Sequence, residues 1–140
     1  MEARNFITEN DLQGVQFSGP LPPQQAWEMV ARCHLGLAIL KNSPNYVESY
    51  PTKMFEYMGL GLPVVASDFP LYRDIVEKNN CGFLVAPEDP EALATLLIRA
   101  YKNQSSISQI SDNALMASKT YEWNTEFQKL QDFYVQVLET

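Results

Sequence analysis

The sequence contains no run of about 18 apolar residues, the length that a membrane-spanning helix requires. Its amino terminus, MEARNFITEN, also lacks the apolar core of a secretory signal peptide, so the chain gives no sign of being exported. Positive charge is scarce, because 10 Lys and Arg stand against 17 Asp and Glu. The net charge of −7 argues against nucleic acid as a partner, since nucleic acid attracts basic surfaces.

Cysteine and histidine are also rare. The two cysteines, Cys33 and Cys81, stand in no metal-binding or Cys-x-x-Cys spacing, and we interpret them as reduced, partly buried thiols. The single histidine, His34, falls where an expected helix leads into a strand, and we interpret it as a structural residue rather than a catalytic base. With 140 residues, 46% of them hydrophobic, the chain can form one core, as a domain or as a piece of a larger one.

Short apolar runs alternate with helical patterns along the chain. The runs predict strands at 15–19, 35–40, 62–67 and 82–86. The other patterns predict helices at 24–33, 52–61, 71–80, 90–103, 105–119 and about 123–139. The fourth of these helices is expected to have Asp89 as its amino-terminal cap and Pro90 as its first residue. This alternation through short loops predicts an α/β fold, a parallel sheet with helices on both faces. The run 62–67 is almost entirely apolar, as the buried interior strands of such sheets are.

Ligands of parallel α/β sheets bind beyond the carboxyl ends of the strands. In this sequence those ends are the segments 19–22, 41–51, 67–70 and 87–89. The second segment overlaps the stretch ESYPTKMFEYMGLGLPVVAS, which begins at residue 48. This stretch carries Glu48 and Glu56, with Lys53 between them. We therefore expect residues 48–56 to lie at the functional edge of the sheet.

The chemistry of this stretch suits a phosphate or diphosphate that is flanked by sugar hydroxyls. A helix that begins near Thr52 points free backbone N–H groups at the edge, and Lys53 in its first turn adds a full positive charge, which together suit a phosphate or diphosphate. Glu56, one turn further on, can accept hydrogen bonds from ribose hydroxyls. Glu48 can face a second sugar or stabilise positive charge at an anomeric carbon. The alternative is that these side chains are solvated surface residues, and that Gly59, Gly61 and Pro63 only end the helix.

Several stretches together resemble the carboxy-terminal half of retaining GT-B glycosyltransferases of group 1, or family-4 type. They are ESYPTKMFEYMGLGLPVVAS, DFPLYRDIVE, NNCGFLVAPEDPEALA and the closing helix that begins with Trp123. The resemblance covers nearly the whole chain and implies a Rossmann-like, donor-binding domain that is truncated at its amino-terminal end. The acceptor would bind an absent amino-terminal domain, toward which the last helix, about 123–139, would cross.

The resemblance also implies roles for individual residues. Glu48 would face the donor sugar as the catalytic carboxylate, and Glu56 would bind the ribose. The diphosphate would be held by the backbone around Thr52, Lys53 and Met54. The loop that follows residues 15–19 would border the base, and its candidates are Gly19 and Leu21. No metal or other cofactor is implied, and the donor would be a UDP-, GDP- or similar sugar used in the cytoplasm.

Two departures from the family pattern affect these expectations. Many relatives have Phe-Gly after the first glutamate, where this chain has Ser49-Tyr50-Pro51. The chain also begins late in the pattern, without the first strands of the donor domain. We therefore expect the isolated chain to be inactive and to self-associate through an exposed sheet edge and the apolar stripe of its last helix.

Two other functions fit the same pattern of elements. Sugar-nucleotide epimerases share the GT-B architecture and would use the same donor site for a different reaction. A non-catalytic, flavodoxin-like module that serves protein contacts would have the same type of sheet and no nucleotide site. Nucleotide binding separates the last alternative from the other two.

Overall fold

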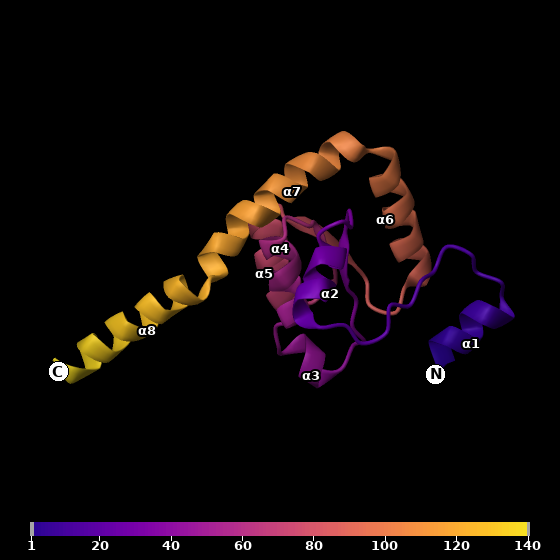
Figure 1. Cartoon of the computed structure of the whole chain (residues 1–140). Coiled ribbons are helices and arrows are strands. Elements are labelled where there is room, and N and C mark those ends of the chain that lie inside the picture. Colours follow the sequence, from indigo (N-terminus) through magenta and orange to yellow (C-terminus); the bar gives the residue numbers. More distant parts are fainter. Residues whose placement is uncertain (1, 140) are drawn as a thin grey trace.

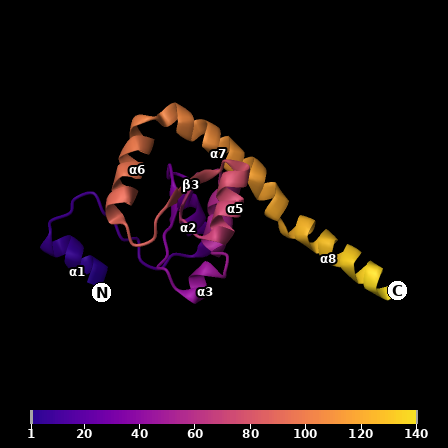
Figure 2. The same cartoon turned by 180° about the vertical axis from the view of Figure 1, so that it is seen from behind.

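The computed structural model describes residues 2–139, and its centre is a three-stranded parallel sheet in the order β1-β2-β3. Figure 1 shows α1 and α8 leaving the body on opposite sides, and Figure 2 shows the same arrangement from behind. The elements are α1 (Glu2–Glu9), α2 (Pro23–Val30), β1 (Gly36–Ala38), α3 (Pro44–Val47), α4 (Thr52–Gly59), β2 (Val64–Ser67), α5 (Pro70–Asn79), β3 (Gly82–Val85), α6 (Pro90–Lys102), α7 (Gln104–Ser118), the short 3₁₀ helix η1 (Lys119–Tyr121) and α8 (Trp123–Leu138).

The middle strand, β2, is the most buried element of the fold. It pairs in parallel with both neighbouring strands. In the register of these pairs, Val64 lies beside Gly36 of β1 and beside Gly82 of β3. All four residues of β2 are buried, because helices cover both faces of the sheet and strands flank both edges of β2. The prediction of a parallel α/β sheet with 62–67 as an interior strand is confirmed.

The two faces of the sheet have separate cores. Val64 and Ala66 point to one face, where they pack in a cluster with residues of α4, α5 and α7. Val65 points to the other face, where it packs with Leu96 of α6. This alternation follows from the two-residue period of a strand. Figure 2 shows α6 on one side of the sheet and α5 on the other.

Helix ends follow the local sequence. Asp89 caps α6, because its carboxylate accepts a 2.8 Å hydrogen bond from the Ala92 N–H. Helix α4 ends in a Schellman motif, in which Gly61 has a φ of +69° and donates its N–H to the Met58 carbonyl at 3.0 Å. The Leu62 N–H donates to the Tyr57 carbonyl at 2.9 Å and completes the motif.

The expected strand at residues 15–19 does not form, and that expectation was wrong. A strand needs a neighbour to satisfy its backbone N–H and C=O groups, and within the described residues no strand pairs with this segment. It runs as irregular, exposed chain between α1 and α2. Two short helices, α1 and α3, lie where the sequence pattern did not predict them.

Helix α8 projects from the body (Figure 1), and it carries an apolar stripe that is exposed to solvent. Its exposed side chains include Trp123, Phe127, Leu130, Tyr134 and Val137. Trp123 is 73% exposed and stacks on Phe127 with ring centroids 5.8 Å apart. Across residues 2–139, no helix has both the length and the hydrophobicity to cross a membrane. The place that the sequence analysis gives to this helix, across an amino-terminal domain, stays a prediction.

The Schellman motif makes a testable pair of substitutions. Gly61→Ala should destabilise the fold by about 1–2 kcal/mol, because an L residue is strained at positive φ. Gly59→Ala should stabilise it by about 0.5–1 kcal/mol, since a methyl group added at this helical glycine would meet no atom within 4 Å. Urea unfolding measures both values. Equal effects of the two substitutions would contradict the assignment of the αL conformation to Gly61.

Candidate functional site

The end of the sheet at which the strands have their carboxyl termini, here called the carboxyl edge, is formed largely by the segment between β1 and β2. Because β1 and β2 are parallel, the chain leaves β1 at this edge, forms α3, and begins α4 there before it returns to β2. Glu48 ends α3, and Lys53 lies in the first turn of α4. The topology thus brings the carboxylate and the ammonium group that the sequence analysis singled out to one edge of one sheet.

The start of this segment is fixed by Ser67, the last residue of β2. The Ser67 side chain is fully buried and bonds both backbone groups of Leu40. The Leu40 N–H donates to Ser67 Oγ at 2.8 Å, and Ser67 Oγ donates to the Leu40 carbonyl at 2.9 Å. The hydroxyl therefore takes the place of the backbone hydrogen bonds that a longer β1 would form with β2. It holds the carboxyl ends of β1 and β2 together.

Tyr72 of α5 fixes the next part of the segment. Its ring is buried against Phe69, and its hydroxyl donates a 2.8 Å hydrogen bond to the Tyr46 carbonyl in α3. Burial raises the pKa of Tyr72 above its ordinary value, so the hydroxyl stays protonated and donates. Val47 packs against the same core. Helix α3 is thereby held in place, with Glu48 exposed at its end.

The amino end of α4 is open to solvent. Pro51 occupies the cap position, and among the described residues no side chain caps the helix. Thr52 and Lys53 are exposed, and within residues 2–139 Lys53 has no ion-pair partner. Met54 differs from them, because its side chain is fully buried in the core and its N–H donates to the Pro51 carbonyl at 3.0 Å. The open end consists of the Thr52 and Lys53 N–H groups and the lysine ammonium.

Glu56 is exposed on α4, one turn after Thr52. The neighbouring Tyr57 turns the other way, and its ring lies so close to Gly36 of β1 that any side chain there would collide with it. Burial, and then the charges of Glu56 and Cys33, raise the pKa of Tyr57. Packing of Tyr57 on β1 therefore fixes the rotation of α4 and, with it, the direction from which Glu56 leaves the helix.

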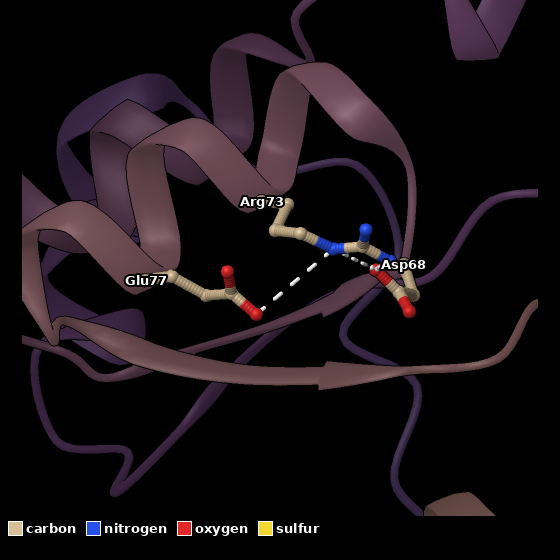
Figure 3. A network of polar contacts seen from close by, with 3 residues as sticks. All are labelled: Asp68, Arg73 and Glu77. Carbon is tan, nitrogen blue, oxygen red and sulfur yellow. Dashed lines mark hydrogen bonds and ion pairs between the residues drawn. The ribbon is translucent and has the colours of Figure 1, made fainter.

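A second positively charged group at this edge, Arg73, was not found from the sequence. The Arg73 guanidinium lies between two carboxylates, as Figure 3 shows. Its Nη2 and Nε lie 2.6 and 3.0 Å from Asp68 Oδ1, and its Nε lies 3.9 Å from Glu77 Oε1. The hydrogen bond to Asp68 is the main cause of a raised pKa of Arg73. The i, i+4 spacing of Arg73 and Glu77 was the available signal.

The other residues that the sequence analysis considered lie outside the segment between β1 and β2. Gly19, with a φ of +71°, and the half-buried Leu21 belong to the irregular segment before α2, so their contact with a base stays a prediction. Both cysteines are free, Cys33 exposed and Cys81 buried, and burial raises the pKa of Cys81 to about 11. His34 lines a pocket at the opposite, amino end of the strands together with Leu62. Residues 2–139 contain no group of three or more His, Cys, Asp or Glu side chains placed to hold a metal.

Comparison with known proteins identifies a family for this arrangement. The family model described as "Glycosyl transferases group 1" matches residues 2–116. A phosphatidyl-myo-inositol mannosyltransferase of Mycobacterium leprae is 29% identical over 87 residues, which are 62% of this chain and 23% of that protein. The chain thus spans less than a quarter of the length of this relative.

Two solved structures share the fold. The sucrose-phosphate synthase of Thermosynechococcus elongatus superposes with a TM-score of 0.81 and 21% identity, over 99% of this chain and 34% of that one. HepE of Anabaena, solved in complex with UDP-glucose, superposes with a TM-score of 0.80 and 25% identity, over 96% of this chain and 36% of that one. The GT-B type of fold predicted from the sequence is confirmed, and the chain spans about a third of each structure.

The Ser67 bridge gives a testable prediction for the edge. Ser67→Ala leaves the N–H and C=O of Leu40 without their partner in a part-buried place, which should destabilise the fold by about 1–3 kcal/mol. Ser106→Ala, at an exposed serine of α7, should change stability by less than about 0.5 kcal/mol. Thermal or urea unfolding checks both. Equal stability of the two variants would contradict the inference that the Ser67 hydroxyl holds β1 and β2 together.

Proposed function

Because the chain belongs to the group 1 glycosyl transferases, we propose that it binds the nucleotide-sugar donor of a glycosyltransferase. We propose further that the whole protein transfers the sugar, with retention of configuration, to a glycan or a lipid-linked acceptor. The observation that carries this proposal is the amino end of α4 at the carboxyl edge of the sheet, where residues 2–139 provide neither a side-chain cap for the helix nor an ion-pair partner for Lys53.

Two findings support a nucleoside diphosphate sugar as the donor. HepE, which shares the fold over nearly all of this chain, has been solved with UDP-glucose and with UDP. The edge also has the chemistry for such a ligand, because a helix amino terminus and an ammonium group attract a diphosphate in spite of the net charge of −7. UDP is therefore the first nucleotide to test, and GDP is the second.

In this proposal, the Thr52 and Lys53 N–H groups and the Lys53 ammonium hold the diphosphate. Met54 contributes through its backbone, provided that its N–H shares the hydrogen bond with Pro51. Glu56 accepts hydrogen bonds from the two ribose hydroxyls. Gly19 and Leu21 border the base. The rigid packing of Tyr57 on β1 supports these roles, because it fixes the rotation of α4.

The proposed reaction breaks the bond between the anomeric carbon and the diphosphate oxygen. Negative charge develops on that oxygen, and the amino end of α4 with Lys53 stabilises it. Glu48 faces the donor sugar and stabilises the positive charge that develops at the anomeric carbon. The acceptor oxygen forms its bond on the same face, and its proton passes to the departing diphosphate. Because the chain supplies the positive charge, the proposed reaction uses no metal.

Other parts of the interpretation follow from the proposal. We place the reaction in the cytoplasm, at the inner face of a membrane where the acceptor is lipid-linked. The acceptor binds mainly to an amino-terminal domain toward which α8 crosses. The exposed stripe of α8 supports the self-association that we expect for the isolated, inactive chain. Among the alternatives, the family match favours transfer over epimerisation, and over a module without a nucleotide site.

Lys53 provides the direct test of the diphosphate site. Lys53→Ala should weaken UDP binding roughly 10- to 150-fold, which corresponds to about 1.5–3 kcal/mol for a charged hydrogen bond. Lys102→Ala, at an exposed lysine in the last turn of α6, should leave the affinity unchanged. Isothermal titration calorimetry with UDP and then GDP measures the affinities. If neither nucleotide binds the unmodified chain, the proposed function is wrong.

Glu56 is tested with a modified nucleotide. A 2′,3′-dideoxy form of UDP should bind the unmodified chain more weakly than UDP, because it lacks both hydroxyls that Glu56 accepts. Glu56→Ala should abolish that difference, whereas Glu91→Ala in α6 should preserve it. The four affinities form a double-mutant cycle. Equal binding of the two nucleotides to the unmodified chain would rule out ribose recognition by Glu56.

A further inference from the structure

A cleft of about 860 Å³ is lined by residues of α5, of η1 and of the start of α8. Its volume falls in the usual range of small-molecule sites, roughly 300–1,000 Å³. Tyr50 lines the cleft, and it follows Glu48 by two residues on the same segment between β1 and β2. Arg73, which is anchored to Asp68 just after β2, lines the same cleft. The cleft therefore begins at the carboxyl edge of the sheet and extends toward α8.

One wall of the cleft is made of three aromatic rings in series. The Tyr50 and Phe55 ring centroids lie 6.0 Å apart, and those of Phe55 and Tyr121 lie 5.2 Å apart. Phe55 and Tyr121 pack against the core, and the Tyr121 hydroxyl accepts a 3.4 Å hydrogen bond from Asn79. Tyr50 remains 48% exposed. The wall is therefore a fixed apolar surface of which one ring is free to stack on a ligand.

Most of the other residues that line the cleft are charged, and their charges are of both signs. Arg73 is already paired with Asp68 and Glu77, so it offers directed N–H groups with little net attraction for an anion. Asp74 and Lys78 are exposed, and the described part of the chain gives neither of them an ion-pair partner. Charges of both signs stand close together here. This arrangement disfavours a strongly charged ligand of either sign and suits a neutral ligand with many hydroxyl groups.

We propose that this cleft binds a carbohydrate, with the apolar face of one sugar ring on Tyr50 and the hydroxyls on Asp74 and Lys78. Its identification as an acceptor subsite rests on the proposed function. A glycan in the cleft has one end beside the segment that carries Glu48, where the donor sugar is proposed to lie. The donor-binding domain thus holds part of the acceptor itself.

The test titrates the 140-residue chain with three neutral oligosaccharides, maltotriose, cellotriose and chitotriose. Saturation-transfer NMR detects binding, and calorimetry measures affinity. At least one of the three should bind, and Tyr50→Ala should weaken it about tenfold, the upper range for one aromatic contact. Asp74→Asn should also weaken it. Tyr101→Ala, at a tyrosine of α6 that is 77% exposed and lies outside the cleft, should have no effect.

Circular dichroism should show that the Tyr50→Ala chain is folded, since this ring is nearly half exposed. The proposal is overturned if none of the three sugars binds, as expected when the cleft instead receives another part of a protein. It is also overturned if Tyr50→Ala and Tyr101→Ala weaken binding equally. A parallel titration with UDP separates the two proposals. UDP binding without sugar binding contradicts the cleft alone, and sugar binding without UDP binding contradicts the donor site alone.

Discussion

The edge of the sheet depends on the two hydrogen bonds between the Ser67 hydroxyl and the backbone of Leu40. Strand β1 is only three residues long, so its ladder to β2 stops before the chain reaches the edge. The buried hydroxyl extends the connection to the point where the chain turns toward α3. Tyr72 then holds α3 from α5, and Tyr57 sets α4 against β1. Glu48, Lys53 and Glu56 are exposed, yet each leaves a backbone that core residues fix.

This division between a fixed backbone and exposed charges explains how an acidic chain can attract a diphosphate. The attraction does not come from the surface as a whole, which carries a net charge of −7. It comes from one helix end and one lysine without a carboxylate partner in the described chain, whereas Arg73, which follows β2, is paired twice. A local positive charge is effective because its field acts over a few ångströms and salt screens the more distant carboxylates.

The sequence allowed the central elements to be predicted because their signals are local. The apolar run 62–67, the Asp89-Pro90 start of α6 and the glycines after α4 each act through neighbouring residues, and the structure has them as expected. The strand at 15–19 failed because strand formation depends on a distant partner. Lys53 and the glutamates could be assigned to the edge by topology alone. The Tyr72 and Arg73 contacts could not, because hydrogen-bond partners that pack together in three dimensions leave only weak spacing signals.

The 3₁₀ turn η1 between α7 and α8 has a mechanical consequence. Helix α8 contains 16 residues and is therefore about 24 Å long, so a rotation of about 10° at η1 displaces its tip by about 4 Å. Tyr121 lies within η1, and Glu126, one turn into α8, lines the aromatic cleft. Because Tyr121 and Glu126 both line the cleft, a change of the angle between α7 and α8 at η1 would also change the width of the cleft.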